Sequence, residues 1–150
     1  MFKKDNLWMK YAINLSLNAK KNNEVPVGSI IVLNNNIIGK GYNSSIKNND
    51  PTAHAEILAL RQAGKKIKNY RLINSVIYVT IEPCLMCIGA IINARIKRLV
   101  FGSFKNKQGM CGSFIYLLNN KKIIKNISIT SGVLLEECSF NIKKFFKNKR

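Results

Sequence analysis

The chain has 150 residues, the length of one ordinary domain, and we expect residues 1–150 to form a single domain. Its 25 lysines and arginines against 7 acidic residues give a net charge of +18. This charge favours a polyanionic partner such as nucleic acid, although a compositional bias toward lysine, asparagine and isoleucine could also produce it. The sequence has no secretory leader, no membrane-length apolar segment and no disulfide framework among its four cysteines, so we expect a cytoplasmic protein and exclude a membrane partner.

The first half of the chain predicts a helix, a β-hairpin and a second helix, from the spacing of its apolar residues. The expected elements are a helix at residues 4–22, strands at 27–33 and 37–42 joined by an asparagine turn at 34–36, and a helix at 53–63. Gly39 and Gly41 in the second strand indicate a bend or a close approach of another backbone. Asp50 or Thr52 is expected to cap the second helix, which should end near Gly64.

The second half alternates strands with helices, which predicts a layered α/β sheet. The expected elements are strands at 76–81, 99–101 and 127–130, a loop at 102–112, and helices at 84–94, 113–119 and 134–147. The continuous apolar run at 76–81 indicates a strand that is buried on both faces. Pro83 suits the first position of the helix that follows this strand, and Gly102 should end the strand at 99–101.

A histidine and two cysteines form a candidate metal-ligand set. Cys84 and Cys87 are spaced i and i+3 at a helix start, so both sulfurs can lie on one face, and His54 stands at the start of the other helix. The C-x-x-C spacing alone also fits a redox pair or half of a structural zinc site. A structural zinc needs four protein ligands, whereas one histidine and two clustered cysteines leave a fourth position for water. Cys111 or Cys138 could close the shell, but both lie in distant segments and fit a buried or free thiol better.

Glu56 lies two residues after His54 and has the chemistry of a proton carrier. Zinc lowers the pKa of a bound water to about 7, and a nearby carboxylate can move the proton that this water gives up. Positions i and i+2 do not share a helix face. The spacing therefore leaves open whether Glu56 joins the site or is a solvated acid in the first helical turn.

Two segments match the H-x-E…P-C-x-x-C signature of zinc deaminases, namely His54-Ala55-Glu56 and Pro83-Cys84-Leu85-Met86-Cys87. Longer segments resemble the bacterial tRNA-specific adenosine deaminase family, in its order and spacing: Glu24-Val25-Pro26-Val27-Gly28, Asp50-Pro51-Thr52-Ala53-His54-Ala55-Glu56, Asn69-Tyr70-Arg71-Leu72 and Glu82-Pro83-Cys84-Leu85-Met86-Cys87-Ile88-Gly89-Ala90. The resemblance runs from about residue 8 to residue 146.

The resemblance implies an α/β, cytidine-deaminase-like three-layer fold with a central mixed five-stranded sheet flanked by helices. It further implies a homodimer with one Zn²⁺ per subunit, which hydrolyses the wobble adenosine of a tRNA anticodon stem-loop to inosine. By the same resemblance His54, Cys84 and Cys87 bind zinc, Glu56 shuttles protons, and Asn43 hydrogen-bonds the flipped base. From its context alone, Asn43 is a turn residue.

Further RNA contacts are implied for Lys107 and for Phe145 and Phe146 in the basic C-terminal helix, although paired phenylalanines also suit a core or dimer contact. The sequence departs from the family at Phe104 and Lys105, where the family has an Arg-Asp pair near the substrate ribose. We therefore assign no ribose contact to Lys105.

Two other functions remain open at this point. The first is deamination of a free base or nucleoside, such as guanine or cytosine, on the same fold, which the basic composition disfavours. The second is a noncatalytic, zinc-stabilised RNA-binding module.

Overall fold

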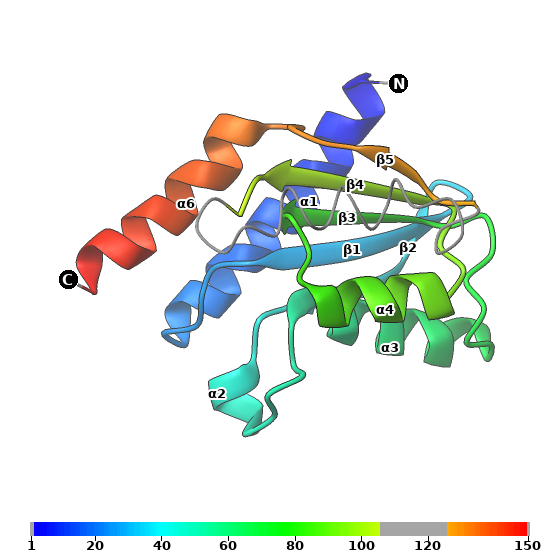
Figure 1. Cartoon of the computed structure of the whole chain (residues 1–150), viewed down its shortest axis with the longest axis horizontal. Helices are drawn as coiled ribbons and strands as arrows, with labels where there is room; N and C mark the ends of the chain where they lie inside the picture. Colours follow the sequence, from blue (N-terminus) through cyan, green and yellow to red (C-terminus); the bar gives the residue numbers. More distant parts are fainter. Residues whose placement is uncertain (1, 106–125, 150) are drawn as a thin grey trace.

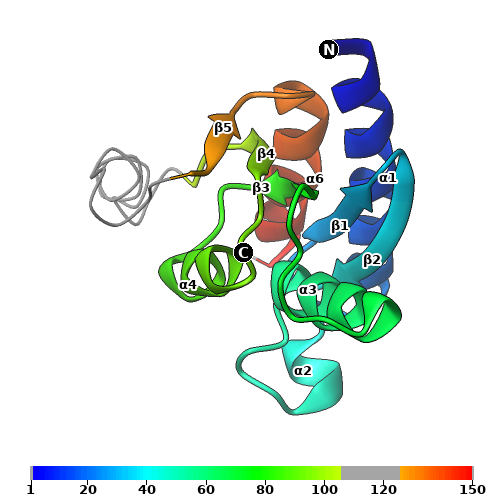
Figure 2. The ribbon, with the colours of Figure 1, turned by 90° about the vertical axis from the view of Figure 1, so that its right-hand side faces the viewer.

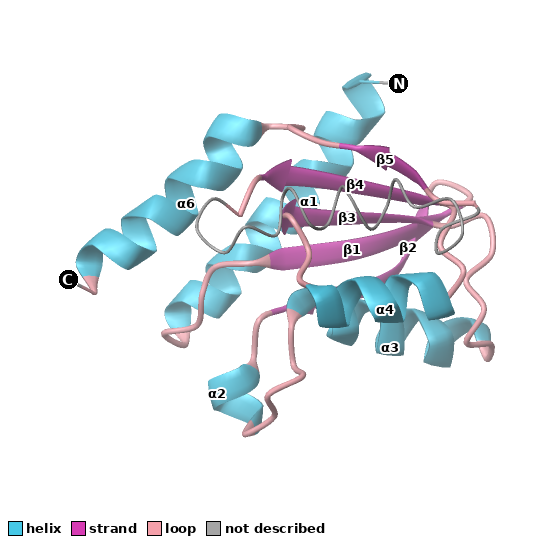
Figure 3. Ribbon diagram, viewed as in Figure 1, coloured by secondary structure: helices cyan, strands magenta, loops and turns pink. Residues whose placement is uncertain are grey.

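A mixed five-stranded sheet lies between two layers of helices in the computed structural model, which describes residues 2–105 and 126–149 (Figures 1 and 3). The elements are α1 (Phe2–Lys21), β1 (Gly28–Leu33), β2 (Asn36–Tyr42), α2 (Ser45–Asn48), α3 (Ala55–Ile67), β3 (Val76–Ile81), α4 (Leu85–Asn93), β4 (Arg98–Ser103), β5 (Ser128–Thr130) and α6 (Leu135–Asn148). The strand order is β2-β1-β3-β4-β5, with β1 antiparallel to both neighbours and β3, β4 and β5 parallel. The predicted fold class is confirmed.

Both faces of the central strands are buried, because helices cover each side of the sheet (Figure 2). On β3, Ile77 belongs to the core beneath α3 and α4, whereas the next residue, Tyr78, belongs to the core beneath α1 and α6. Leu99 and Val100 divide in the same way on β4. This alternation explains the unbroken apolar runs, since successive side chains of a strand point to opposite faces.

The two glycines of β2 permit close packing of α3 on the sheet, as the sequence indicated. A Cβ atom at Gly39 would overlap the carbonyl oxygen of Ala59, and one at Gly41 would overlap that of Ala55. Backbone therefore packs directly on backbone here. The contact fixes the first turn of α3 against the sheet, close to His54.

The predicted ends of α3 were wrong at both termini. His54, not Asp50 or Thr52, occupies the N-cap position, and Asp50 Oδ1 instead accepts a hydrogen bond from the Thr52 amide (2.8 Å) in a tight turn. The helix continues through Gly64 to Ile67 and ends where Lys68 adopts a left-handed conformation (φ 56°). A glycine inside a helix costs only about 1 kcal/mol relative to alanine, which packing against β2 offsets.

Two further local predictions were wrong. Pro83 precedes the N-cap residue Cys84 instead of opening α4. Gly102 lies inside β4, which continues to Ser103, and its missing side chain makes room for Cys138 of α6. The short helix α2 had no counterpart in the sequence prediction.

A buried polar network joins α1 to the sheet at the end of the strands opposite Ser103. Asp5 is 2% exposed and accepts hydrogen bonds from Arg98 Nη2 (2.6 Å), Arg98 Nη1 (2.9 Å) and the Tyr78 hydroxyl (2.9 Å). Burial, followed by the Asp5 carboxylate, raises the pKa of Tyr78. The network holds α1 against β3 and β4.

Some sequence predictions lie outside the described residues: the helix at 113–119, the RNA contact at Lys107 and the thiol of Cys111. Within residues 2–105 and 126–149, no helix has the length and apolar character needed to cross a membrane.

Candidate active site

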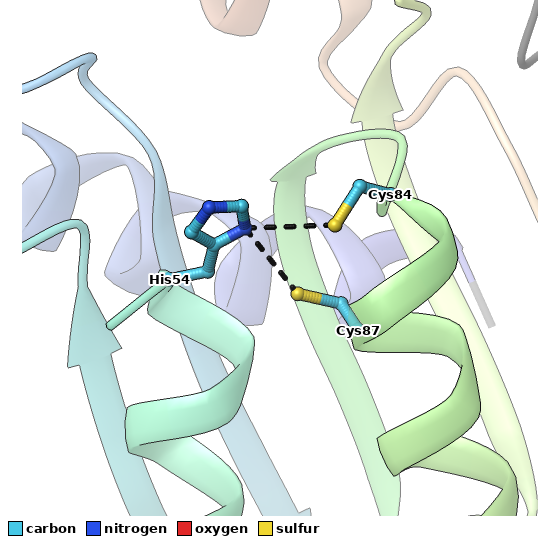
Figure 4. A group of neighbouring side chains, drawn as sticks. All are labelled: His54, Cys84 and Cys87. Carbon is cyan, nitrogen blue, oxygen red and sulfur yellow. Dashed lines mark hydrogen bonds between the residues drawn. The ribbon is translucent and has the colours of Figure 1, made fainter. Parts of the chain in front are cut away.

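Two helix N-termini meet beside the carboxyl end of β3. The segment that follows β2 and α2 leads into α3, with His54 at its N-cap, and β3 leads into α4, with Cys84 at its N-cap and Cys87 in its first turn (Figure 4). His54 Nδ1 lies 3.5 Å from Cys84 Sγ and 3.6 Å from Cys87 Sγ. The two helix starts therefore bring the three candidate metal ligands together.

The spacing of these three atoms suits a tetrahedral zinc ion. Zn–N bonds of about 2.05 Å and Zn–S bonds of about 2.3 Å at a tetrahedral angle place nitrogen and sulfur about 3.6 Å apart. The three ligand atoms all lie within 4.8 Å of one another. Among the described residues, no other three His, Cys, Asp or Glu side chains gather in this way, and the buried Cys138 stands outside the group. The group can hold one metal ion and leave a fourth position open.

The ionisation of the two thiols also favours the binding of a cation. Hydrogen bonds from Cys87 and from His54 lower the pKa of Cys84 to about 3, so this residue is a thiolate at neutral pH. The hydrogen bond to Cys84 and burial raise the pKa of Cys87. Without a cation the pair favours a single negative charge. A divalent ion would stabilise the second thiolate as well.

Glu56 is a buried residue of this site and not a solvated acid. It lies in the first turn of α3, is 3% exposed and lines the same pocket as His54 and Cys84. Burial raises the pKa of its carboxyl, and the nearby Cys84 adds to that effect. Helix geometry did not anticipate this position because His54 is outside the helix, with an extended backbone (φ −75°, ψ 154°).

The pocket in front of this group has a volume of about 910 Å³ and combines an apolar wall with a basic rim. The apolar wall consists of Val25, Val27, Ile81, Phe104, Ile142 and Phe146. The lysines at the pocket are Lys105, Lys143 and Lys147. Both carboxylates of the lining, Glu56 and Glu82, are buried, whereas Lys143 and Lys147 are exposed.

The Asn43 side chain both makes a hydrogen bond within the fold and lines the pocket. Its Oδ1 accepts a hydrogen bond from the Ala55 amide (2.9 Å), which supplies the cap that His54 does not make. The Asn43 side chain also lines the pocket, and its Nδ2 makes no hydrogen bond within the described part of the chain. The residue is therefore more than a turn former, because it caps α3 and also lines the pocket.

The two C-terminal phenylalanines differ in exposure. Phe145 is 7% exposed and packs edge-on against Phe146, with ring centroids 5.4 Å apart. Phe146 is 49% exposed and lines the pocket. The burial of Phe145 leaves Phe146 as the ring with exposed surface at the pocket.

Residues 2–103 match the family described as the cytidine and deoxycytidylate deaminase zinc-binding region. Together with the His/Cys/Cys group, this match defines a zinc-dependent deaminase. A tRNA-specific adenosine deaminase of Buchnera aphidicola subsp. Baizongia pistaciae is 53% identical over 152 residues, which cover 100% of this chain and 93% of that protein. One of Haemophilus influenzae is 50% identical over 147 residues, 97% of this chain and 85% of that protein. The chain belongs to the tRNA-specific adenosine deaminase family.

A solved structure shares the fold. It comes from work on A-to-I editing by tRNA:A34 deaminases at the wobble position of transfer RNA, and it superposes with a TM-score of 0.83 at 34% identity. The match covers 89% of this chain and 97% of that chain. The family and the fold that the sequence motifs implied are thus confirmed.

Proposed function

We propose that this protein hydrolyses the wobble adenosine of a tRNA anticodon stem-loop to inosine and ammonia. The observation that carries the proposal is the buried Glu56 carboxylate, which shares a pocket with the His54, Cys84 and Cys87 group. The names of the relatives supply the substrate. We further propose that residues 1–150 form one domain and that the protein works as a cytoplasmic homodimer with the tRNA as its partner.

In this proposal His54, Cys84 and Cys87 hold one zinc ion, which when bound acts as a Lewis acid and lowers the pKa of a water molecule to about 7. Glu56 accepts a proton from the attacking water and donates it to the ring nitrogen adjacent to C6. It then takes the proton of the hydroxyl group now bonded to C6 and transfers it to the departing amine, so that the C6–N bond breaks, a C6 carbonyl forms, one water is consumed and one ammonia is released. The raised pKa of the buried carboxyl suits a group that must hold a proton between two transfers.

Asn43 would orient the base through the Nδ2 donors of its amide, because the residue lines the pocket. Since Oδ1 is held by the Ala55 amide, the donor group has a fixed direction before the substrate enters. Such preorganisation lowers the entropic cost of binding.

The lysines of the pocket favour a polynucleotide over a free base. Lys143 and Lys147 are one helical turn apart on α6, and Lys105 follows β4, so two separate elements bring positive charge to the pocket. A free base carries no phosphate to meet these groups, whereas a nucleotide in an RNA loop carries one on each side. Phe146, which is exposed and lines the pocket, would stack on a base, and Lys107 remains a predicted RNA contact.

The test is to incubate the zinc-loaded protein with tRNA that has an anticodon adenosine, and separately with free adenosine, guanine and cytosine. Inosine and ammonia should form from the tRNA. Glu56→Ala should reduce the rate by about 10²-fold to 10⁴-fold, the usual contribution of a general acid-base group. Glu136→Ala, which removes an exposed glutamate of α6, is the matched control and should retain activity.

Turnover restricted to the free bases would overturn the tRNA proposal in favour of a base deaminase. tRNA binding without ammonia release that depends on Glu56 would indicate a noncatalytic module instead. Zinc content separates the ligands from the proton carrier: Glu56→Ala should keep one zinc per subunit, whereas Cys87→Ala should lose it. A Cys87→Ala protein with stoichiometric zinc would contradict the three-ligand site.

A further inference from the structure

A buried glutamate lies just outside the site and accepts hydrogen bonds from a helix that lies more than 20 residues later in the chain. Glu24, between α1 and β1, is 4% exposed. Its Oε1 accepts hydrogen bonds from the backbone amides of Ile46 (2.7 Å) and Lys47 (3.0 Å), which belong to the first turn of α2. A helix normally receives these bonds from its own N-cap residue. Here Ser44 occupies that position, but its hydroxyl donates to the Tyr42 carbonyl (2.9 Å) and makes no cap.

The element that Glu24 holds adds nothing to the core. None of the four residues of α2 is buried, and Ile46 is 64% exposed. A helix of this length is not stable by itself, because the nucleation cost exceeds the gain from so few hydrogen bonds. A buried carboxylate is costly unless it is hydrogen-bonded. The contact of Glu24 with α2 is therefore poorly explained as a device for core stability.

The segment that contains α2 joins two residues of the site. Residues 43–54 begin with Asn43 and end with His54, and both side chains line the pocket. The ends of the segment are bonded together: the Ser44 amide donates to the Ala53 carbonyl (2.9 Å), and Asn43 Oδ1 accepts from the Ala55 amide (2.9 Å). A shift of α2 would therefore move both ends.

We propose that Glu24 is a positioning residue, which anchors α2 and thereby holds the segment 43–54 so that Asn43 faces the base. The inference rests on the proposed function for its kinetic readout and on the hydrogen-bond network for its structural one. Glu24 achieves its effect without touching the substrate.

Glu24→Ala removes the acceptor, whereas Glu24→Gln keeps a carbonyl oxygen that can accept the same two amides. For Glu24→Ala we expect KM for tRNA to rise about tenfold or more, kcat to change less, and zinc to stay at one per subunit, because the metal ligands are retained. Glu24→Gln should restore most of kcat/KM. Amide hydrogen exchange at Ile46, Lys47 and Ala55 should accelerate in Glu24→Ala and be close to wild type in Glu24→Gln.

Two controls separate positioning from stability and from charge. Asp5→Asn weakens the buried network at the far end of the strands and should lower Tm while leaving KM and the Ala55 exchange rate unchanged. Glu136→Ala removes the same charge from an exposed site.

Unchanged exchange at Ala55 in Glu24→Ala would overturn the inference whether or not the wild-type protein deaminates tRNA. Failure of Glu24→Gln to restore kcat/KM would also overturn it. If the wild-type protein does not deaminate tRNA, the proposed function fails, and accelerated exchange at Ala55 in Glu24→Ala would still support the anchoring role.

Discussion

At the scale of single residues, the N-cap residues of two helices serve as candidate metal ligands, and the capping hydrogen bond of α3 is left to another side chain. His54 and Cys84 both occupy N-cap positions, yet neither side chain caps its own helix. An N-cap side chain points toward the helix axis end, where a bound ion also gains from the helix dipole. Because these two side chains face each other, the cap of α3 comes from Asn43. A residue outside the ligand set thus becomes essential to its geometry.

The two halves of the Asn43 amide can be separated by substitution. Asn43→Asp keeps an oxygen acceptor for the Ala55 amide but loses the N–H donors, so we expect Tm near that of the wild type and kcat/KM for tRNA reduced about 10²-fold or more. Asn43→Ala loses both and should also lower the free energy of unfolding by about 1 kcal/mol, the usual value of a cap. Thermal unfolding and steady-state deamination measure the two effects. A fully active Asn43→Asp protein would contradict the donor role.

The described cysteines should differ in reactivity once metal is removed. The hydrogen bonds from Cys87 and His54 lower the pKa of Cys84 to about 3, whereas burial raises that of Cys138 to about 12. A pH of 7 lies above the pKa of Cys84, so that thiol is ionised. It lies below the pKa of Cys138, so that thiol is protonated. Iodoacetamide should therefore alkylate Cys84 much faster than Cys138 in the chelated protein, as read by mass spectrometry in a Cys111→Ser background. Comparable rates at the two positions would refute the prediction.

At the scale of elements, α6 reaches the pocket only because it packs tightly on β4. A Cβ atom at Gly102 would overlap the Cys138 sulfur, so no larger residue fits between the helix and the strand. The Ser139 hydroxyl donates to Ser103 Oγ (3.1 Å) at the same contact. One and two turns further along, α6 contributes Ile142 and Phe146 to the pocket wall.

Gly102→Ala should therefore push α6 outward. We expect the free energy of unfolding to fall by about 1–3 kcal/mol, as for overpacking, and KM for tRNA to rise because the pocket wall moves. Gly64→Ala is the matched control: it lies inside α3, where a Cβ would make only ordinary contacts, and should stabilise the protein by about 0.5–1 kcal/mol. Equal effects of the two substitutions would show that the close approach of α6 has no energetic weight.

Sequence periodicity predicted the elements that are organised by burial and missed those that are organised by distant partners. The apolar runs located β1, β3 and α4 to within a residue or two. The helix α2 escaped because Glu24, which caps it, lies 22 residues from Ile46. Gly102 was misread as a strand end because its neighbour Cys138 belongs to a helix that follows much later.

The sequence predicted which residues could bind a metal ion, but it did not predict how the other residues of the site are positioned around them. The spacing of Cys84 and Cys87 places both sulfurs on one side of a helix start, which the local sequence determines. The place of Glu56 depends instead on the extended backbone of His54 outside α3, and that conformation follows from the tertiary contacts of the segment before it. The capping role of Asn43 likewise needs the hairpin and α3 to be assembled.

At the scale of the whole molecule, we expect the effect of the net charge of +18 on tRNA binding to depend on the positions of the lysines. The rim lysines of α6 should contribute to tRNA affinity as counterions are released. For single-stranded nucleic acid, the slope of log affinity against log salt becomes shallower by about 0.7 for each phosphate that the protein no longer neutralises. The double variant Lys143→Gln/Lys147→Gln should therefore show a shallower slope of log KM against log salt.

Lys65→Gln/Lys68→Gln provides the control for this measurement, since both lysines are at the end of α3 remote from His54. We expect its slope to equal that of the wild type. A slope that falls equally in both double variants would mean that the charge acts as a diffuse field and not through the rim.

The pairing of β1 with β3 has a consequence for the amount of folded protein in the cell. This antiparallel register, with Ile30 opposite Tyr78, brings together ligands that are 30 and 33 residues apart in the chain. The unfolded chain keeps only the Cys84 and Cys87 pair, so zinc binds the folded state preferentially. Such linkage stabilises the fold by about 2.7 kcal/mol when free ligand is at about 100 times Kd. In a zinc-poor cell, turnover by proteases would then follow metal supply, and the amount of enzyme would fall together with its activity.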